Sequence, residues 1–146
     1  MISIASQTIK RITYEAKKAY PDECCGLLAG TVSLNGAVTI TQLRPSTNVA
    51  KATNRRNFEI DPKVHFDLIH ELKGTKERII GHYHSHPNYP ARPSEKDLKR
   101  ALDPQLLWLI ISLDESRINE VKLHQLNDKT ATFCEVPLLI IEKSQQ

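Results

Sequence analysis

The longest apolar runs of this chain, LLWLIISL at residues 106–113 and VPLLIIE at residues 136–142, are each only as long as one β-strand. Short apolar runs are typical of strands buried in a sheet, whereas a helix that crosses a membrane needs about 18 apolar residues. The sequence therefore predicts a core built on a β-sheet and no membrane helix. Residues 1–20 mix Lys and Arg with apolar residues, unlike the continuous apolar stretch of a secretory signal, so a cytoplasmic protein is expected.

The size and composition of the chain are those of one globular domain. It has 146 residues, of which 40% are hydrophobic and 25% charged, and it contains no internal repeat and no long linker. We therefore expect a single domain over residues 1–146. The formal net charge of +3 is spread along the sequence and aromatic residues make up only 5%, which argues against nucleic acid as a partner.

The three cysteines do not suggest a disulfide framework. They are odd in number and two of them, Cys24 and Cys25, are adjacent, which favours a reducing compartment over an oxidising one. Both are interpreted as small residues of the core, and so is Cys134, which lies in a strand-like segment.

Three helices can be located from their apolar spacing and their ends. Apolar residues recur at helical intervals in residues 8–20, and Pro21 ends that segment. A second helix is expected after Asp61, an N-cap residue that precedes a proline, and Gly74 marks its end. A shorter helix is expected at residues 93–102.

The strands are short β-prone runs separated by turn residues. Two of them form an expected hairpin around the dipeptide Asn35-Gly36. The expected strands are residues 24–32, 36–43, 78–86, 106–113, 118–126 and 130–141. Together with the helices they predict a mixed α/β fold, in which a central sheet is flanked by about three helices.

Three histidines occupy alternate positions in the strand-like segment GHYHSHP, residues 81–87. Alternate residues of a strand share one face, so His82, His84 and His86 are expected to point the same way. Same-face neighbours lie about 6 to 7 Å apart, close enough for two imidazoles to converge on one metal ion. All three would spread over about 13 Å, too far for zinc–nitrogen distances of about 2.0 to 2.1 Å. His82 is therefore expected to pack beside such a site.

The segment PSEKD, residues 93–97, allows two interpretations. Ser94 and Asp97 stand at the N-cap and N3 positions of the third helix, where a serine and an acid form a capping box. Alternatively, Asp97 joins His84 and His86 to give two nitrogens and one oxygen, the three-ligand set of a catalytic zinc site. The residues alone leave both interpretations open.

A general base would have to come from elsewhere in the chain. Hydrolysis by a metal-activated water needs a group that takes the proton and passes it to the leaving amine. The candidate is Glu23, which lies between the end of the first helix and an apolar strand. In isolation it would be interpreted as a solvated turn residue.

Taken together, these two stretches resemble the JAMM (MPN+) metallopeptidase family. Its pattern is a glutamate in P-x-E-x-C-G-x-L-x-G, followed much later by H-S-H-P and P-S-x-x-D, with ten residues between the second histidine and the aspartate. The matching residues are Pro21, Glu23, Cys25, Gly26, Leu28 and Gly30, and then His84, Ser85, His86, Pro87, Pro93, Ser94 and Asp97. The resemblance covers nearly the whole chain, and no position of the pattern is missing.

The resemblance implies a mixed α+β MPN/JAMM-like domain with a central mixed sheet, and it implies residue roles. His84, His86 and Asp97 would hold one zinc ion per chain. Glu23 would be the general base and acid, and Ser94 would donate a hydrogen bond to the oxyanion of the tetrahedral intermediate. The chain is then expected to be an active zinc metallopeptidase that hydrolyses a peptide or isopeptide bond without a cysteine nucleophile.

The resemblance also implies a class of substrate. Members of this family characteristically cut after the Gly-Gly tail of ubiquitin or ubiquitin-like proteins, and the short chain looks like the compact prokaryotic members, which are associated with ubiquitin-like sulfur-carrier proteins. Such a carrier is the expected partner, and a membrane is not. An extended tail could add to a sheet edge near the metal, and residues 55–60, with Arg55 and Arg56, are the expected lining of that groove.

Two other functions fit the sequence. One is a non-catalytic MPN-like interaction module whose histidines are structural, and the intact Glu23 and Ser94 argue against it. The other is a related peptidase acting on peptidoglycan or phage-tail components, which export or a fused lytic domain would favour. Bound metal would separate the interaction module from an enzyme. The sequence predicts no oligomeric state.

Overall fold

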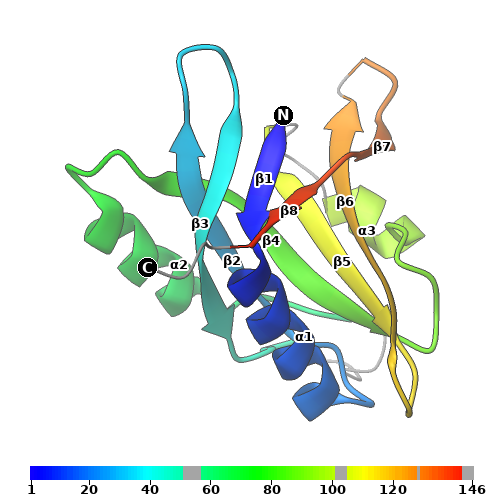
Figure 1. Ribbon diagram of the computed structural model, residues 1–146. Helices are drawn as coiled ribbons and strands as arrows, with labels where there is room; N and C mark the ends of the chain where they lie inside the picture. Colours follow the sequence, from blue (N-terminus) through cyan, green and yellow to red (C-terminus); the bar gives the residue numbers. More distant parts are fainter. Residues whose placement is uncertain (51–56, 101–104, 128, 143–146) are drawn as a thin grey trace.

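The structure is a computed structural model that describes residues 1–50, 57–100, 105–127 and 129–142 (Figure 1). The strands are β1 (Ile2–Ala5), β2 (Cys25–Val32), β3 (Val38–Ser46), β4 (Arg78–Pro87), β5 (Leu107–Leu113), β6 (Ile118–Asn127), β7 (Thr132–Val136) and β8 (Leu139–Ile141). The helices are α1 (Ser6–Ala19), α2 (Pro62–Leu72) and α3 (Glu95–Arg100). Within these residues the predicted fold class, a central mixed sheet flanked by three helices, is confirmed. None of the described helices has the length and apolar character needed to cross a bilayer.

The strands form one mixed sheet in the order β7-β6-β5-β4-β2-β3-β1-β8. Strand β4 lies inside it, antiparallel to β2 and parallel to β5. A parallel neighbour requires a crossover connection, and the segment that carries α3 supplies it. The edge strands β7 and β8 are joined only by Pro137 and Leu138, and a connection of two residues can span at most about 10 Å. Because eight strands laid flat would span about 33 Å, the sheet must curl.

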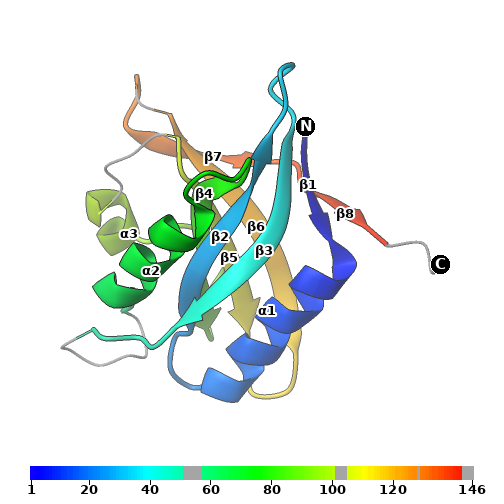
Figure 2. The ribbon, with the colours of Figure 1, turned by 90° about the vertical axis from the view of Figure 1, so that its left-hand side faces the viewer.

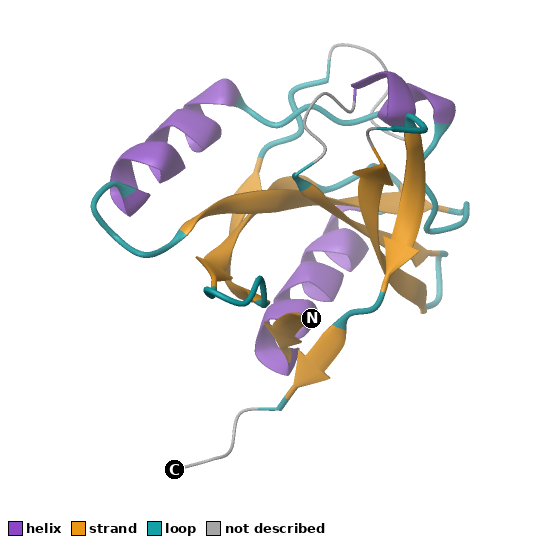
Figure 3. Cartoon of the chain, turned by 90° about the horizontal axis from the view of Figure 1, so that it is seen from above, coloured by secondary structure: helices purple, strands orange, loops and turns teal. Residues whose placement is uncertain are grey.

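The helices cover both faces of the sheet. Figure 2 shows α1 on one side of the strands and α2 and α3 on the other, and the view from above in Figure 3 shows the same separation. Helix α1 buries Ile12 and Ala16 in a cluster that includes Tyr83 of β4. Helix α2 packs Leu68 against Leu27 of β2. Successive residues of β2 and β4 therefore alternate between the α1 side and the α2 side.

The predicted ends of the second helix are confirmed. Asp61 is the N-cap of α2, and its carboxylate accepts a hydrogen bond from the Lys63 N–H at 3.0 Å. Gly74 follows the helix with a φ of +81°, a left-handed value that favours glycine. Helix α1 ends at Ala19, just before Pro21, as predicted.

The hairpin predicted around Asn35-Gly36 is confirmed, with a loop longer than two residues. The Ser33 N–H donates to the Ala37 carbonyl at 2.8 Å, and the Gly36 N–H donates to the Ser33 carbonyl at 2.9 Å. Gly36 has a φ of +87°. This is the geometry of a three-residue loop that ends in a left-handed residue.

The C-terminal strands differ from the prediction. The expected strand 130–141 is broken at Pro137, because proline has no N–H for the ladder, and its halves lie at opposite edges of the sheet. The prediction that Cys134 is buried was wrong. Its neighbour Phe133 packs on Trp108, so Cys134 faces the other side of an edge strand, toward solvent. Strand β1, which was not predicted, pairs in parallel with both β3 and β8.

Candidate metal centre

The pairing of β2 with β4 places Glu23 beside two histidines. Cys25 of β2 lies opposite His84 of β4. Counting back along the antiparallel pair, Glu23 lies level with His86. Residues two apart share a face, so Glu23, His84 and His86 point to the same side of the sheet. That side is the one covered by α2 and α3, since Leu27 packs there against α2.

Four buried polar side chains meet at this end of β4. His84 and His86 are 0% exposed, Glu23 3% and Asp97 5%. The Nε2 atoms of His84 and His86 are 3.0 Å apart, and Oδ2 of Asp97 lies 3.4 Å from each of them. Candidate ligand atoms of Glu23, His84 and His86 all lie within 4.8 Å of one another. The structure thus brings together Glu23 and the three residues that the sequence suggested as metal ligands.

The spacing of the His84, His86 and Asp97 donor atoms fits a tetrahedral metal ion. At zinc–ligand distances of about 2.0 to 2.1 Å, neighbouring ligands of a tetrahedral site are about 3.3 Å apart. The three separations here are 3.0, 3.4 and 3.4 Å. Two imidazoles and a carboxylate are also a donor set that zinc accepts. These side chains can therefore hold zinc with little movement.

Helix α3 brings Asp97 to the histidines through its own cap. The Ser94 N–H donates to Oδ2 of Asp97 at 2.8 Å, and the Asp97 N–H donates to Oγ of Ser94 at 3.1 Å. This is a complete capping box. The two interpretations of PSEKD are therefore compatible, because one carboxylate caps the helix and also approaches both histidines. The Ser94 hydroxyl accepts in this box and keeps its own proton for donation.

Burial and hydrogen bonding act in opposite directions on the pKa values of the site. Burial alone would raise the pKa of Asp97, but hydrogen bonds with His84, His86 and the Ser94 N–H outweigh it and hold that pKa far below its ordinary value. Burial lowers the pKa of His84 by more than the hydrogen bond with Asp97 raises it. An ionised carboxylate and a neutral imidazole are the states in which these groups bind a metal.

Contacts behind the two histidines set their orientation. Nδ1 of His86 lies 2.7 Å from the Pro90 carbonyl, which can only accept, so Nδ1 carries a proton and the ring directs Nε2 toward the site. His84 stacks on Phe58, with ring centroids 4.1 Å apart and an interplanar angle of 15°. Nδ1 of His84 is buried with no hydrogen-bond partner among the described residues.

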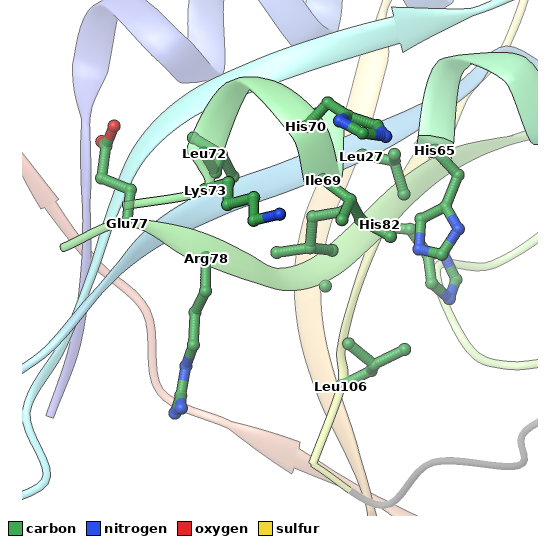
Figure 4. Close-up of a pocket in the computed structure, with 12 residues that line it drawn as sticks. Leu27, His65, Ile69, His70, Leu72, Lys73, Glu77, Arg78, His82 and Leu106 are labelled. Carbon is green, nitrogen blue, oxygen red and sulfur yellow. The ribbon is translucent and has the colours of Figure 1, made fainter. Parts of the chain in front are cut away.

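His82 lies between the site and a neighbouring cavity, as expected for a packing residue. Its ring is 5.9 Å from that of His84 and 4.2 Å from that of Trp108, and burial lowers its pKa to about 3. The cavity has a volume of about 770 Å³ and lies between α2 and the first half of β4 (Figure 4). Its described lining includes His82 but neither His84 nor His86. The cavity is therefore beside the candidate metal centre and does not contain it.

The side chain of Asn48 holds the backbone at Glu23, a role that was not predicted from the sequence. Its Nδ2 donates to the carbonyls of Glu23 at 3.1 Å and Asn57 at 2.9 Å. Its Oδ1 accepts from the N–H groups of Ala50 at 3.1 Å and Glu59 at 3.0 Å. Every donor and acceptor position of the amide is thus used. In the sequence, Asn48 stands in a polar, turn-rich stretch, and nothing there indicates these distant partners.

Two further residues around the histidines were not assigned a role from the sequence. Oγ of Ser85, between the histidines, accepts from the Cys24 N–H at 2.8 Å and so anchors the start of β2. The Tyr89 hydroxyl donates to Oε2 of Glu23 at 3.1 Å, and the Tyr89 ring stacks on His86. Ser85 belongs to the motif, whereas no pattern in the sequence indicates a role for Tyr89.

Cys24 and Cys25 lie next to Glu23 but are not reactive thiols. They are 9% and 2% exposed, which confirms that they pack in the core. Burial raises the pKa of Cys24 to about 11 and that of Cys25 to about 12. Both are neutral thiols at physiological pH, and the thiolate is the nucleophilic form of cysteine.

Known proteins resemble this chain in sequence and fold. The profile of the family described as prokaryotic homologs of the JAB domain matches residues 5–124. Desampylase from Haloferax volcanii is 37% identical over 94 residues, which cover 64% of this chain and 65% of that protein. The CysO-cysteine peptidase of Mycobacterium tuberculosis is 24% identical over 143 residues, which cover 98% of this chain and 93% of the peptidase. AF2198, a JAB1/MPN domain protein from Archaeoglobus fulgidus, has the same fold, with a TM-score of 0.59 and 24% identity over 96% of this chain and 99% of its own.

The family match spans most of the chain and contains every residue of the candidate metal centre. The fold and the two-part motif agree with it. The chain therefore belongs to the family of prokaryotic homologs of the JAB domain, within the JAMM metallopeptidases.

Proposed function

We propose that His84, His86 and Asp97 hold a catalytic zinc ion and that Glu23 is the general base of a peptidase reaction. The observation that carries the proposal is the convergence of three buried donor atoms at separations of 3.0 to 3.4 Å, with the Glu23 carboxylate beside them. Three protein ligands leave the fourth position of a tetrahedral zinc ion open, as catalysis requires. When bound, zinc would polarise the scissile carbonyl and lower the pKa of a water molecule.

Two carboxylates, those of Asp97 and Glu23, are candidates for the third ligand, and their contacts favour Asp97. Oδ2 of Asp97 lies 3.4 Å from both Nε2 atoms and is held there by the cap of α3. One oxygen of Glu23 is instead engaged by the Tyr89 hydroxyl. We therefore assign Asp97 as the ligand and Glu23 as the group that takes a proton from the attacking water and returns it to the leaving nitrogen.

Ser94 is assigned as the oxyanion donor. Its Oγ accepts from the Asp97 N–H, which fixes the serine beside the third ligand and leaves the hydroxyl proton to point elsewhere. A hydroxyl aimed at the oxygen of the tetrahedral intermediate stabilises the charge that develops there. The same bond makes Ser94 a cap, so its two roles need separate measurements.

We infer that the substrate is a protein with a thin Gly-Gly tail, of the ubiquitin-like or sulfur-carrier class. The donor atoms belong to side chains that are 0 to 5% exposed, so a substrate must reach them with little bulk, and glycine allows the closest approach of a backbone. One relative is a CysO-cysteine peptidase and another a desampylase, which supports a small protein tail as the target. Of the predicted lining at residues 55–60, Arg55 and Arg56 lie outside the described residues, and the whole groove stays a prediction.

Metal content and cleavage test the proposal together. Untagged wild type and His86→Ala are prepared identically, and zinc per chain is measured by atomic absorption. We expect about one zinc in the wild type and little in the variant. The zinc-loaded wild type is then incubated with a carrier whose Gly-Gly end is extended by a peptide bond or by a lysine isopeptide bond, and mass spectrometry should locate a cut directly after Gly-Gly.

Three results would contradict parts of the proposal. Wild type and His86→Ala without zinc even after zinc is supplied would favour the interaction module. Equal zinc in both proteins would place the metal elsewhere. Zinc binding with cleavage of peptidoglycan peptides but not of the tailed carrier would keep the chemistry and change the substrate.

A further inference from the structure

Tyr89 connects two parts of the candidate site, the segment just before β2 and the end of β4. Its hydroxyl donates to Oε2 of Glu23 at 3.1 Å. Its ring stacks on His86, with centroids 4.0 Å apart and an interplanar angle of 11°. We propose that Tyr89 is a positioning residue that holds the base Glu23 and the ligand His86 in one fixed arrangement. The inference rests on the roles proposed above for those two residues.

The loop that carries Tyr89 is held by three side chains of β5 and β6, of which Ser112 and His124 are buried and Glu120 is exposed. Oγ of Ser112 donates to the Tyr89 carbonyl at 2.5 Å. Nε2 of His124 lies 2.7 Å from the Ala91 carbonyl, and Oε2 of Glu120 accepts from the Ala91 N–H at 3.3 Å. Ser112 and His124 are each 4% exposed. The backbone on which the tyrosine stands is therefore fixed by the core of the sheet and does not depend on Glu23.

The same loop holds His86 from a second direction. The Pro90 carbonyl accepts from Nδ1–H of His86 at 2.7 Å, while the neighbouring Tyr89 ring covers a face of the imidazole. The hydrogen bond sets the tautomer of His86, and the stacked ring limits its rotation. Residues 89 and 90 thus fix both the direction and the plane of one proposed ligand.

The hydroxyl and the ring of Tyr89 have separable consequences. A carboxylate whose one oxygen accepts a hydrogen bond cannot rotate freely, so the Tyr89 hydroxyl contributes to fixing where the other oxygen of Glu23 lies. A base must be within hydrogen-bond reach of the proton it takes, and small misplacements cost rate. The hydroxyl is therefore expected to act on the chemical step, and the ring on metal binding through His86.

Three variants separate these consequences. Tyr89→Phe removes the hydroxyl and keeps the ring, and Tyr89→Ala removes both. The matched control is Tyr20→Phe, because the Tyr20 hydroxyl donates to Oδ1 of Asn88 at 2.9 Å and so holds the same loop at a point away from Glu23. All three are compared for zinc affinity and for kcat and KM with the tailed carrier.

In Tyr89→Phe we expect kcat to fall about tenfold, the effect of losing one hydrogen bond to a charged group, with KM and zinc affinity unchanged. In Tyr89→Ala, zinc affinity should also fall about tenfold, as when a contact that orients a ligand is lost. Tyr20→Phe should match the wild type. Wild-type kcat in Tyr89→Phe, or an equal loss in Tyr20→Phe, would overturn the inference.

A spectroscopic measurement tests the contact without metal or substrate. In metal-free protein labelled with 13C at glutamate carboxyl carbons, the Glu23 resonance is identified by its loss in Glu23→Gln. It should shift in Tyr89→Phe and stay in place in Tyr20→Phe, and an unchanged resonance in Tyr89→Phe would overturn the inference directly.

If the wild type neither binds zinc nor cleaves the carrier, the proposed function fails and the role of Tyr89 fails with it. If the wild type does both and Tyr89→Phe is as fast, only the inference fails.

Discussion

One oxygen of Asp97 serves two purposes, and a pair of variants can separate them. Oδ2 accepts from the Ser94 N–H at 2.8 Å and lies 3.4 Å from Nε2 of both His84 and His86. Asp97→Ala removes the cap and the proposed ligand together. Ser94→Ala removes the other half of the capping box, the 3.1 Å bond from the Asp97 N–H, and leaves the carboxylate in place.

The expected magnitudes follow from these contacts. In metal-free protein, Ser94→Ala should lower the free energy of unfolding by about 1 kcal/mol, the usual value for a lost cap. Asp97→Ala should lower the free energy of unfolding by about 2 kcal/mol, because the contacts with two buried imidazoles are lost as well. Removing the buried carboxylate also removes its desolvation cost, which offsets only part of this loss. With free zinc at about 100 times its dissociation constant, the free energy of unfolding of the wild type and of Ser94→Ala should each rise by about 2.7 kcal/mol. Asp97→Ala should gain little.

Thermal unfolding with chelator and with zinc measures both effects. For a chain of this length 1 kcal/mol corresponds to about 3 °C in Tm, so zinc should raise the Tm of the wild type and of Ser94→Ala by about 8 °C. An equal zinc-induced rise in Asp97→Ala would refute its assignment as a ligand and leave it as a helix cap. Loss of the rise in Ser94→Ala would refute the claim that the carboxylate keeps its place without the full capping box.

Three further predictions use other residues and other measurements. Glu23→Gln should keep about one zinc per chain while kcat falls at least about a hundredfold, because the ligands remain and proton transfer is lost; atomic absorption and single-turnover cleavage test this, and near-wild-type turnover would mean a different base. The lowered pKa of Asp97 stabilises the metal-free protein fully above the ordinary carboxyl pKa of about 3.9, and that stability is lost as the pH falls toward the lowered folded-state value. The free energy of unfolding, measured with urea at a series of pH values, should therefore fall more steeply between about pH 5 and pH 2 in the wild type than in Asp97→Asn. Iodoacetamide at about pH 8 should label Cys134, which is exposed, and spare Cys24 and Cys25, whose pKa values burial raises to about 11 and 12; mass spectrometry of native and unfolded protein checks this, and activity should survive the labelling.

The local parts of the site could be predicted from the sequence because they depend on short-range geometry. The alternation of a strand places His84 and His86 on one face, and the capping preference of a helix start places Ser94 and Asp97 together. Both patterns act within four residues. The structure shows the same local arrangements, with the two Nε2 atoms 3.0 Å apart and a complete capping box.

The rest depends on contacts between distant parts of the chain, which no local pattern specifies. Glu23 reaches the histidines only because Cys25 pairs with His84 across the sheet. Tyr89 and Glu23 are 66 positions apart. The final strand-like segment was predicted as one element, since its β-propensity is continuous, but Pro137 divides it between two edges of a curled sheet. Local propensity therefore located the strands but did not specify their neighbours.

The tautomers of the two histidines connect the metal-free site to zinc binding. In the neutral form of His86, in which Nδ1 donates to the Pro90 carbonyl, Nε2 can only accept, and the 3.0 Å contact then places a proton on Nε2 of His84. Nδ1 of His84 is buried and has no partner among the described residues. A metal held by His84 would need the Nε2 lone pair, so the proton would have to leave that atom, and Nδ1, which has no partner among the described residues, could receive it. Because burial lowers the pKa of His84, its imidazole would be neutral with and without the metal, and His84 would not have to lose a proton for the ion to bind.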